Sequence, residues 1–268
     1  MVSVFKILLA FCFFLPSLLH AETYTFGIVP QQSASKLAAL WVPILRQVSK
    51  DSGHKLIFKT AKNIPEFEKK LASEEYDFSY MNPYHYTVFH ESANYNAILK
   101  AKDKRIKGII VVKKDSPYKQ LEDLNNQNIA FPSPAAFAAT ILTQSALKQR
   151  KVNITPKYVS SHDSVYRNIA QGRLAAGGGV IRTFKNTEAS IKDQLTILWT
   201  SDGFTPHAIA VHKRVPSKNA NSIQKSFITL SSKNNTKKLL SKIKLKGLES
   251  AQNADWNDVR ELKIEILK

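Results

Sequence analysis

The chain has 268 residues, of which 43% are hydrophobic and 22% charged, values close to the averages of globular proteins. This length fits one large domain or two lobes, and the single cysteine, Cys12, excludes both a disulfide-held scaffold and a cysteine-based zinc site. The formal net charge of +18 indicates an anionic partner, namely nucleic acid, anionic lipid or a small anion, without choosing among them.

The N-terminus has the pattern of a secretory signal peptide. Lys6 is followed by a short apolar run at 7–15, by the helix-breaking Pro16, and by the small residue Ala21 at a suitable cleavage point. The apolar run is too short to span a bilayer, which takes about 20 apolar residues. We therefore predict that residues 1–21 are removed on export. The alternatives are a buried N-terminal strand or an uncleaved anchor.

Export changes what the composition implies. Cleavage removes the only cysteine, and it removes Lys6 but no acid from the 39 basic and 21 acidic residues, so the net charge falls from +18 to +17. We expect the mature chain to be soluble and exported and not to span a membrane, because no later segment has the required length and apolar character. An exported protein is not expected to bind nucleic acid, which favours a small anionic ligand.

The stretch from residue 23 to residue 90 alternates between strand and helix patterns. Strands are expected at 23–29, 54–60 and 77–81, and helices at 36–52 and from about Pro65. Ser35 and Asn63 are suitable N-caps, and Gly53 is suited to close the first helix. Pro43 predicts a kink or a later start of that helix. This alternation indicates a parallel α/β sheet.

A second α/β unit follows. Strands are expected at 106–113, 128–131, 157–160, 174–180, 195–199 and 207–212, helices at 135–150 and 163–172, and a helical segment throughout 217–268. Two such units predict two lobes with a cleft between them. Ligands of open α/β sheets bind beyond the carboxyl ends of the strands. The candidate loops are therefore 30–35, 82–86, 132–137, 160–164 and 180–183.

Two of these loops carry residues suited to an anion. Loop 132–137 opens a helix directly after a strand, and the free N–H groups and dipole of a helix N-terminus attract anions. Ser133 is suited to face the ligand, although a simple N-cap is the commoner role of serine there. His162 in loop 160–164 is suited to point into the cleft, with a neighbouring serine or aspartate as the N-cap.

A hydrolase is the enzymatic alternative, since serine, histidine and aspartate occur together at 161–163. Adjacency in sequence is not evidence for a triad, because triads assemble in space, and the chain contains no Gly-x-Ser-x-Gly elbow. Two histidine pairs lack the spacing of a zinc protease motif: His85 with His90, and His207 with His212. We therefore expect no catalytic residue, no metal site and no cofactor.

The remaining candidates are ambiguous from sequence alone. Arg182 follows the glycine-rich strand and is suited either to a bidentate contact with a carboxylate or phosphate or to a solvated surface. The run 177–179 lacks the spacing of a nucleotide-binding loop and favours close backbone approach instead. Tyr84 and Tyr86 are suited to line a pocket or to pack in the core. The six-lysine stretch 233–246 favours a solvated helical face over contact with an anionic surface.

An ordered set of motifs over residues 24–260 resembles the periplasmic phosphate-, phosphite- and phosphonate-binding proteins of ABC transporters. No single motif is decisive, and their order and spacing carry the resemblance. The motifs are Phe26-Gly27-Ile28-Val29-Pro30, Leu40-Trp41-Val42-Pro43, Tyr76 to Pro83 before Tyr86, Ile129-Ala130-Phe131-Pro132-Ser133, Ser161-His162-Asp163-Ser164 before Asn168 to Arg173, and Thr205-Pro206-His207-Ala208-Ile209.

The resemblance implies a two-lobed type II periplasmic-binding fold in the α/β class. Each lobe is expected to hold a mixed, mostly parallel sheet flanked by helices, and two hinge strands near 99–105 and 205–207 join the lobes. Lobe 1 is expected to comprise 22–104 with 206–268, and lobe 2 to comprise 105–205. The expected ligand contacts are Tyr84, Tyr86, Ser133, Ala135, Ala136, Phe137, His162, Arg182 and His207.

This sequence departs from the family pattern in two places. Phosphonate binders usually have small hydroxyl residues where this chain has Pro134-Ala135-Ala136, so Ser133 alone is left as a side-chain donor while the backbone N–H groups remain. The family's acidic residue after the glycine-rich strand is replaced near Val180, and Arg182 stands close by. These changes favour a more anionic ligand over one that bears an amine.

The leading hypothesis is a solute-binding protein that captures a small anion by cleft closure for the permease of an ABC importer. The anion is expected to be phosphonate-, phosphate- or phosphite-like, or a related organic anion. The alternatives are a sensory module that reports ligand occupancy to a membrane histidine kinase, and an exported hydrolase that uses His162.

Overall fold

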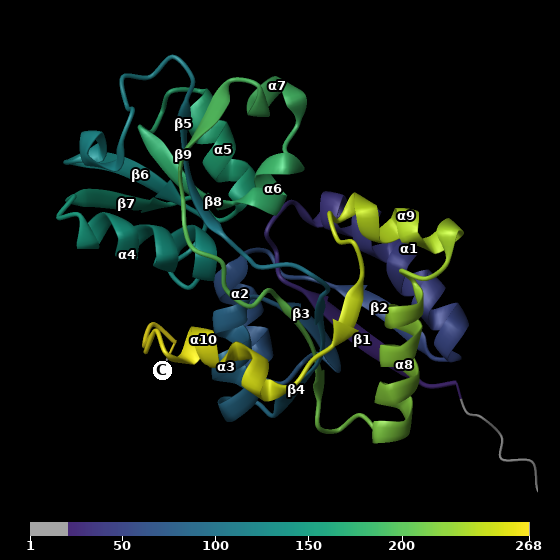
Figure 1. Ribbon diagram of the computed structural model, residues 1–268. Helices are drawn as coiled ribbons and strands as arrows, with labels where there is room; N and C mark the ends of the chain where they lie inside the picture. Colours follow the sequence, from purple (N-terminus) through teal and green to yellow (C-terminus); the bar gives the residue numbers. More distant parts are fainter. Residues whose placement is uncertain (1–20, 268) are drawn as a thin grey trace, which may run out of the picture.

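The computed structural model describes residues 21–267, so residues 1–20 of the expected signal peptide lie outside the described part. The chain forms two lobes, each with a sheet between helices (Figure 1). Lobe 1 is defined here as the six-stranded sheet with its helices, and lobe 2 as the five-stranded sheet with its helices. This arrangement confirms the α/β, two-lobed expectation.

Within residues 21–267, no helix combines the length and apolar character that crossing a bilayer requires.

The sheet of lobe 1 is mixed and has the strand order β11-β4-β10-β3-β1-β2. Its strands are β1 (Thr23–Ile28), β2 (Lys55–Lys59), β3 (Phe78–Met81), β4 (Tyr95–Ala101), β10 (Ala208–His212) and β11 (Leu248–Ser250). Parallel pairing joins β1 to β2 and β3, whereas β10 runs antiparallel between β3 and β4. The strand that returns from lobe 2 therefore lies in the middle of the lobe 1 sheet.

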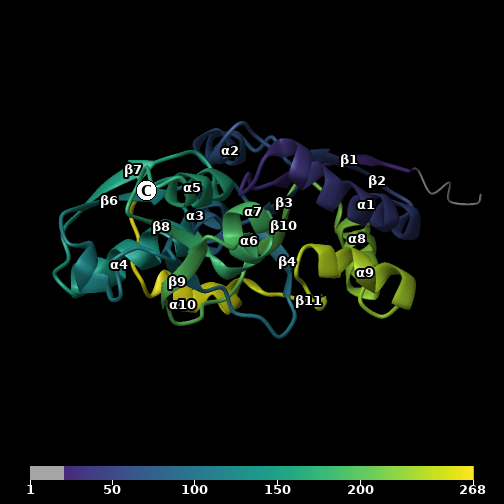
Figure 2. The same cartoon turned by 90° about the horizontal axis from the view of Figure 1, so that it is seen from above.

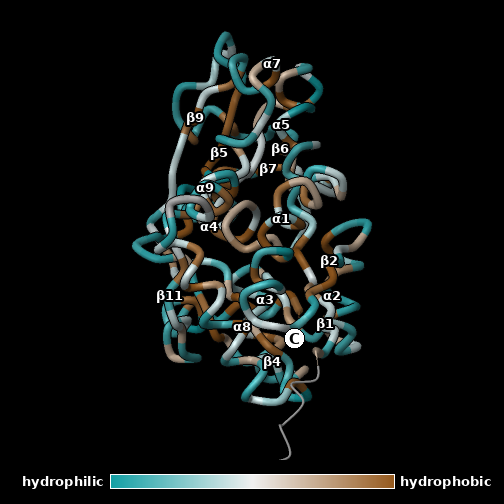
Figure 3. Tube along the Cα trace, turned by 90° about the vertical axis from the view of Figure 1, so that its right-hand side faces the viewer, coloured by the Kyte–Doolittle hydropathy of each residue, from teal (hydrophilic) through white to brown (hydrophobic). Residues whose placement is uncertain are grey.

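Helices cover both faces of this sheet. They are α1 (Ala34–Ser52), α2 (Ile64–Ala72), α3 (Pro83–Ser92), α8 (Ser217–Thr229), α9 (Asn234–Lys242) and α10 (Asn257–Arg260). Figures 1 and 2 show α1, α8 and α9 on one side and α2, α3 and α10 on the other. Trp41 of α1 is buried between Phe26 and Tyr80, with ring centroids 6.2 Å and 4.7 Å away. In Figure 3 the outer loops are largely hydrophilic.

Local signals explain most helix ends and correct one prediction. The side chain of Asn63 caps α2 as expected, and Gly53, at φ 77°, closes α1 in the left-handed conformation that glycine adopts without strain. The N-cap of α1 is Ser33, whose hydroxyl accepts from the Lys36 N–H at 3.4 Å, so the prediction of Ser35 was wrong. The helix runs through Pro43.

The C-terminal part is not helical throughout, which corrects the expectation for 217–268. After α9 the chain forms β11, which pairs antiparallel with β4, and then a 3-10 turn at Asn253–Trp256 before α10. The reason is the free edge of β4, whose backbone groups at Leu99–Ala101 pair with those of β11. This pairing brings the C-terminal segment to the place where the chain crosses between the lobes.

Lobe 2 holds the strand order β7-β6-β8-β5-β9. Its strands are β5 (Gly108–Lys113), β6 (Gln127–Phe131), β7 (Ile154–Tyr158), β8 (Ala176–Val180) and β9 (Leu195–Thr200). Its helices are α4 (Leu142–Gln149), α5 (His162–Ala170), α6 (Ile181–Lys185) and α7 (Ala189–Lys192), with a 3-10 turn at Leu121–Leu124. A π-helical turn, Phe137–Ile141, precedes α4 where the sequence predicted a regular helix from 135.

The glycine run of β8 allows close packing on both faces of the lobe 2 sheet. A Cβ at Gly178 would collide with the carbonyl oxygen of Ala139 in the π-helical turn, and a Cβ at Gly179 would collide with the Tyr166 ring of α5. A Cβ at Gly108 of β5 would likewise meet the carbonyl of Ala138. This confirms the prediction of close backbone approach, and it seats the π-helical turn directly on the sheet.

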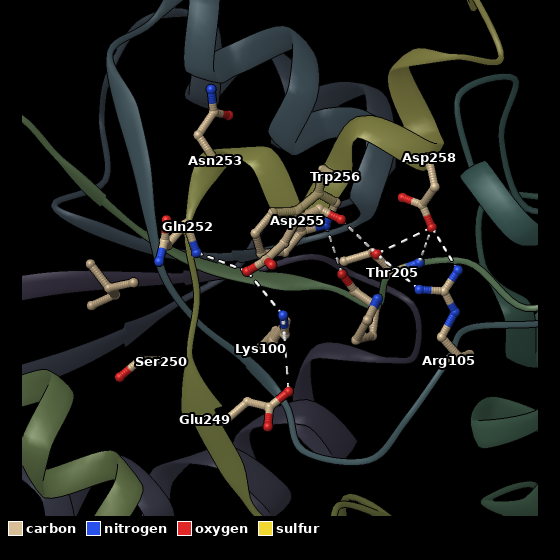
Figure 4. Close-up of polar contacts among 12 residues, drawn as sticks. Lys100, Arg105, Thr205, Glu249, Ser250, Gln252, Asn253, Asp255, Trp256 and Asp258 are labelled. Carbon is tan, nitrogen blue, oxygen red and sulfur yellow. Dashed lines mark hydrogen bonds and ion pairs between the residues drawn. The ribbon is translucent and has the colours of Figure 1, made fainter.

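Two crossing segments, 102–107 and 201–207, join the lobes. They pair at one point, where Ile106 and Phe204 exchange backbone hydrogen bonds of 2.8 and 2.9 Å. The C-terminal segment holds both segments from one side (Figure 4). One carboxylate oxygen of Asp258 accepts from the Arg105 guanidinium and from the Thr205 N–H, each at 2.8 Å.

Candidate functional site

A small cavity lies between the lobes, at the point where the strands of both sheets end. Its volume is about 10 Å³, which is room for roughly one water molecule. Both lobes contribute to its lining, and none of the lining residues is acidic. They are Val29, Gln31, Ile64, Asn82, Ile106, Ala136, Phe137, Ala138, Ala139, His162, Val180 and His207.

The start of the π-helical turn forms the lobe 2 wall of this cavity. Residues 136–139 line it, and the first N–H groups of a helix have no intrahelical carbonyl to which they donate. Ser133 lies just before the turn, is buried, and its hydroxyl has no hydrogen-bond partner in the described part of the chain. This wall therefore offers N–H donors and one free hydroxyl beside the cavity, as anion binding requires.

His162 lies at the first position of α5, next to its N-cap Ser161. Its backbone N–H donates to the carbonyl of Gln31 in lobe 1 at 3.1 Å. Its ring Nδ1 lies 3.3 Å from the hydroxyl oxygen of Thr183. Burial, together with the charge of Arg182, lowers the pKa of His162 to about 3. The imidazole is therefore neutral at physiological pH and offers one donor and one acceptor.

His207 lies directly before β10 and lines the same cavity from lobe 1. Its ring stacks on that of Tyr80, with centroids 4.8 Å apart. Nε2 of His207 is buried without a hydrogen-bond partner among the described residues. Burial first, and then the charge of Arg182, lowers the pKa of His207 well below its usual value. A second neutral imidazole with an unused ring nitrogen therefore borders the cavity.

Arg182 of α6 connects the lobes rather than facing open solvent. Its guanidinium donates to the side-chain oxygen of Gln31 and lies over the Tyr80 ring, 5.6 Å from the ring centroid. Its charge contributes to the lowered pKa values of His162 and His207. Arg182 is not among the residues that line the small cavity, but it lines the larger pocket next to it.

Three further polar contacts join the lobes along the cleft. The side-chain amide of Asn82 donates to the carbonyl of Ala135 at 3.1 Å, and this contact is buried. The amide of Gln32 donates to the Asp163 carboxylate at 3.5 Å, and the Lys36 ammonium lies 3.7 Å from the same carboxylate. The structure thus has the lobes in contact over the cavity.

The expected ligand contacts divide into two groups. Ala136, Phe137, His162 and His207 line the cavity, while Ser133, Ala135 and Arg182 lie beside it. The side chains of the other two, Tyr84 and Tyr86, point elsewhere.

The structure places Tyr84 and Tyr86 in the interior of lobe 1, away from the cavity. The Tyr86 hydroxyl donates to the side-chain oxygen of Asn253 at 3.0 Å and accepts from the Ala97 N–H at 3.3 Å. The Tyr84 hydroxyl accepts from the Leu267 N–H at 2.8 Å. Both residues lie on α3 and tie that helix to the C-terminal segment and β4, which is a packing role.

Two polar cavity residues, Gln31 and Asn82, were missing from the predicted contacts. Both lie in strand-to-helix loops that the sequence did mark, and both are 5% exposed. A buried amide needs hydrogen-bond partners, and here lobe 2 supplies them. The sequence signal was the loop position alone. Within residues 21–267, no group of three or more metal-ligating side chains is placed to hold an ion.

Comparison with known proteins identifies a family whose pattern this chain matches. A family described as the periplasmic substrate-binding protein of phosphonate ABC transporters matches residues 26–256. Among curated proteins, none matches the chain.

Several solved structures share the fold at low sequence identity. A binding protein component of an ABC phosphonate transporter from Pseudomonas aeruginosa superposes with a TM-score of 0.83 at 14% identity, over 91% of this chain and 86% of that one. PhnD1 from Prochlorococcus marinus, in complex with methylphosphonate, gives 0.82 at 15% identity, over 90% and 96%. XAC2383 from Xanthomonas citri, bound to chloride ion, gives 0.71 at 12% identity, over 90% and 95%.

The family match spans most of the chain, and the two-lobed architecture with its cavity between the lobes agrees with it. The family consists of transport proteins that bind substrate in the periplasm and is not a family of enzymes. The chain therefore belongs to the periplasmic substrate-binding proteins of phosphonate ABC transporters.

Proposed function

We propose that this chain, as a monomer exported by a cleaved signal peptide, captures a small oxyanion between its lobes and delivers it to the permease of an ABC importer. The proposed ligand is a phosphonate, or the related phosphate or phosphite. The observation that carries the proposal is the cavity between the lobes, lined by a helix start and two histidines and by no acidic residue. The phosphonate in the related Prochlorococcus structure supports the ligand class.

In this proposal the oxyanion binds at the wall formed by residues 136–139. The N–H groups and dipole of the helix start attract negative charge, and Ser133 adds a hydroxyl donor. His162 and His207 are neutral, so they contribute through single N–H donors and not through charge. Arg182 lies next to the cavity, and its planar guanidinium suits phosphonate oxygens.

Binding in this proposal requires the lobes to separate and close again. A tetrahedral phosphonate group is several times larger than a water molecule and does not enter a cavity of about 10 Å³. The contacts from Gln31, Asn82 and Lys36 to lobe 2 would break on opening and form again around the ligand. The crossing segments would act as hinges between lobe 1, residues 22–104 with 206–268, and lobe 2, residues 105–205.

The test combines mass spectrometry of ligand carried through purification with a thermal-shift screen of phosphate, phosphite, methylphosphonate, sulfonates and carboxylates. We expect a rise in melting temperature with at least one phosphorus oxyanion and a smaller rise with carboxylates and sulfonates, because the donors of the cavity wall suit a tetrahedral dianion. Calorimetry then gives the affinity. A screen in which no phosphorus oxyanion binds would refute the proposed ligand class.

A further inference from the structure

A larger pocket opens beside the cavity at the mouth of the cleft. Its volume is about 480 Å³, and it shares Ile106, Val180 and His207 with the cavity, so the two spaces lie next to each other. Most of its lining comes from the first crossing segment, α6 of lobe 2 and the loop that follows α9, and the rest includes Tyr80 of β3 and the second crossing segment. The residues that line it are Tyr80, Ala101, Lys104, Arg105, Ile106, Lys107, Val180, Ile181, Arg182, Lys185, Pro206, His207, Ser241, Lys244, Leu245 and Lys246.

The pocket is strongly cationic. Seven of its lining residues are lysine or arginine, and none is aspartate or glutamate. Of the seven, only Arg105 has a carboxylate partner within the described part of the chain, the side chain of Asp258 at 2.8 Å. The lysines between β4 and β5, on α6 and after α9 therefore converge on one space with no acidic group to balance their charge. Such a lining attracts anions and disfavours cations.

Lys104 is the most enclosed of these lysines. Its ammonium donates to the carbonyl of Lys244 at 2.5 Å, which holds it at the wall of the pocket. Burial, and then the charges of Arg182 and Lys185, lower the pKa of Lys104 to about 8. A partly buried ammonium whose nearest charges are also positive lacks a counter-ion, and an anion in the pocket would supply one.

Arg182 links this pocket to the cavity. Its guanidinium lines the pocket and also donates to Gln31, which lines the cavity. A ligand with one anionic group at the helix start and a second in the pocket would therefore pass this side chain. Val180 and His207 line both spaces, and they offer apolar surface and a neutral ring to the ligand's carbon atoms.

From this geometry we infer that the pocket binds a second anionic group of the ligand. This inference rests on the proposed function. The ligand class is then a phosphonate or phosphate monoester whose organic part bears a carboxylate or a further phosphate, and an aminoalkyl phosphonate is disfavoured. The stretch 233–246, which the sequence favoured as a solvated surface, contributes two of its lysines, Lys244 and Lys246, to this site.

The experiment compares three phosphonates of similar size by calorimetry: phosphonoacetate, propylphosphonate and 2-aminoethylphosphonate, with methylphosphonate as the minimal ligand. On the wild type, phosphonoacetate is expected to bind about tenfold more tightly than propylphosphonate, because its carboxylate gains a charged hydrogen bond in the pocket. We expect 2-aminoethylphosphonate to bind more weakly than either, because its ammonium group is repelled by the like charges of the pocket. In the double variant Lys104→Gln with Lys185→Gln, the preference for phosphonoacetate is expected to disappear, while methylphosphonate affinity changes by less than about threefold.

The matched control is Lys218→Gln with Lys225→Gln. Both lysines are exposed on α8 and neither lines the pocket, so the control removes the same charge at a different place. We expect it to keep the preference for phosphonoacetate. The single variant Lys185→Gln, at an exposed position, repeats the measurement if the double variant does not fold.

The two proposals fail in distinguishable ways. Wild-type protein that binds none of the four phosphonates, and neither phosphate nor phosphite, contradicts the proposed function and this inference with it. Wild-type protein that binds phosphate or phosphite but none of the four phosphonates contradicts this inference alone. Wild-type protein that binds methylphosphonate and propylphosphonate, but gains nothing from phosphonoacetate, contradicts this inference alone. So does a preference that persists in the Lys104 and Lys185 variants, or one that the α8 control removes equally.

Discussion

The guanidinium of Arg182 lies where three features meet: the side chain of Gln31 across the cleft, the ring of Tyr80, and the cationic pocket. From sequence alone, a cleft position and a solvated surface were equally reasonable for this arginine. The contact to Gln31 holds the guanidinium at the cleft, where its charge adds to the effect of burial in lowering the pKa values of both histidines at the cavity. Any anion that enters the cleft would offset this local excess of positive charge.

Replacing Arg182 with alanine is expected to weaken phosphonate binding by about 1 to 3 kcal/mol, the range for loss of a hydrogen bond to a charged group. Calorimetry with methylphosphonate measures the loss. The control is Arg46→Ala, which removes the same charge from an exposed position on α1. Equal affinity in Arg182→Ala and Arg46→Ala would remove Arg182 from the ligand site.

Acid is expected to destabilise the protein through His162. Its pKa is about 3 in the folded chain and about 6.5 when unfolded, so the unfolded chain binds the extra proton between these values. The contribution is fully present above pH 6.5 and is lost as the pH falls toward 3, at up to about 1.4 kcal/mol per pH unit. Denaturant titrations at several pH values should show a shallower loss in His162→Gln. An unchanged slope in that variant would contradict the assignment.

The elements around the cleft depend on glycine at the sites of closest packing. At the position of Gly178, β8 touches the carbonyl of Ala139 and the ring of Phe131, so the π-helical turn rests on the sheet without an intervening side chain. The N–H groups proposed to bind the anion belong to the same turn. Its position, and with it the lobe 2 wall of the cavity, therefore follows from the absence of a side chain on β8.

Gly178→Ala is expected to lower the free energy of unfolding by about 1 to 3 kcal/mol through overpacking, and to weaken phosphonate binding by shifting the turn. Gly53→Ala is the control, because Gly53 has φ 77° but open space around it. There we expect a loss of about 1 kcal/mol from the left-handed conformation and unchanged binding. Denaturation and calorimetry on both variants make the comparison, and unaltered binding in Gly178→Ala would count against the role of the turn.

The sequence predicted elements well where a helix or strand has one buried and one exposed face. Helix α3 was missed because residues 83–87 and Phe89 are all buried, which leaves no amphipathic period to detect. Strand β11 was missed because three residues are too few to show alternation. Both misses concern lobe 1, where segments distant in the sequence enclose α3 and pair with the edge of β4.

The sequence could predict a site residue only where its position in a strand-to-helix loop was enough to place it at the cleft. His162 and the turn 133–137 follow strands directly, so their place at the cleft could be read from loop position. The roles of Gln31 and Tyr86 depend on partners far along the chain, Arg182 for the first and Asn253 for the second. A tyrosine close to a loop gives no sign of whether its hydroxyl faces a ligand or a distant asparagine.

For the molecule as a whole, the surplus of basic residues has two components. Most of it is spread over the surface, whereas the pocket at the cleft gathers seven cations in one space. Both attract anions over a distance set by the Debye length.

The association rate of an anionic phosphonate should therefore fall as salt is added. Between about 0.01 M and 1 M ionic strength the Debye length shrinks from about 30 Å to about 3 Å, which removes the long-range attraction. The dissociation rate should change less, because it reports short-range contacts. Stopped-flow measurement of both rates tests this, and an association rate independent of salt would contradict steering by the pocket.

The placement of β10 between β3 and β4 has a consequence for the order in which the chain folds. The lobe 2 sheet comes from one uninterrupted stretch, 108–200, and is able to form as soon as that stretch is available. The lobe 1 sheet needs β10, residues 208–212, in its interior. Strands β3 and β4 therefore lack the partner between them until β10 is available. A chain that emerges N-terminus first therefore begins with the lobe whose sheet is completed last.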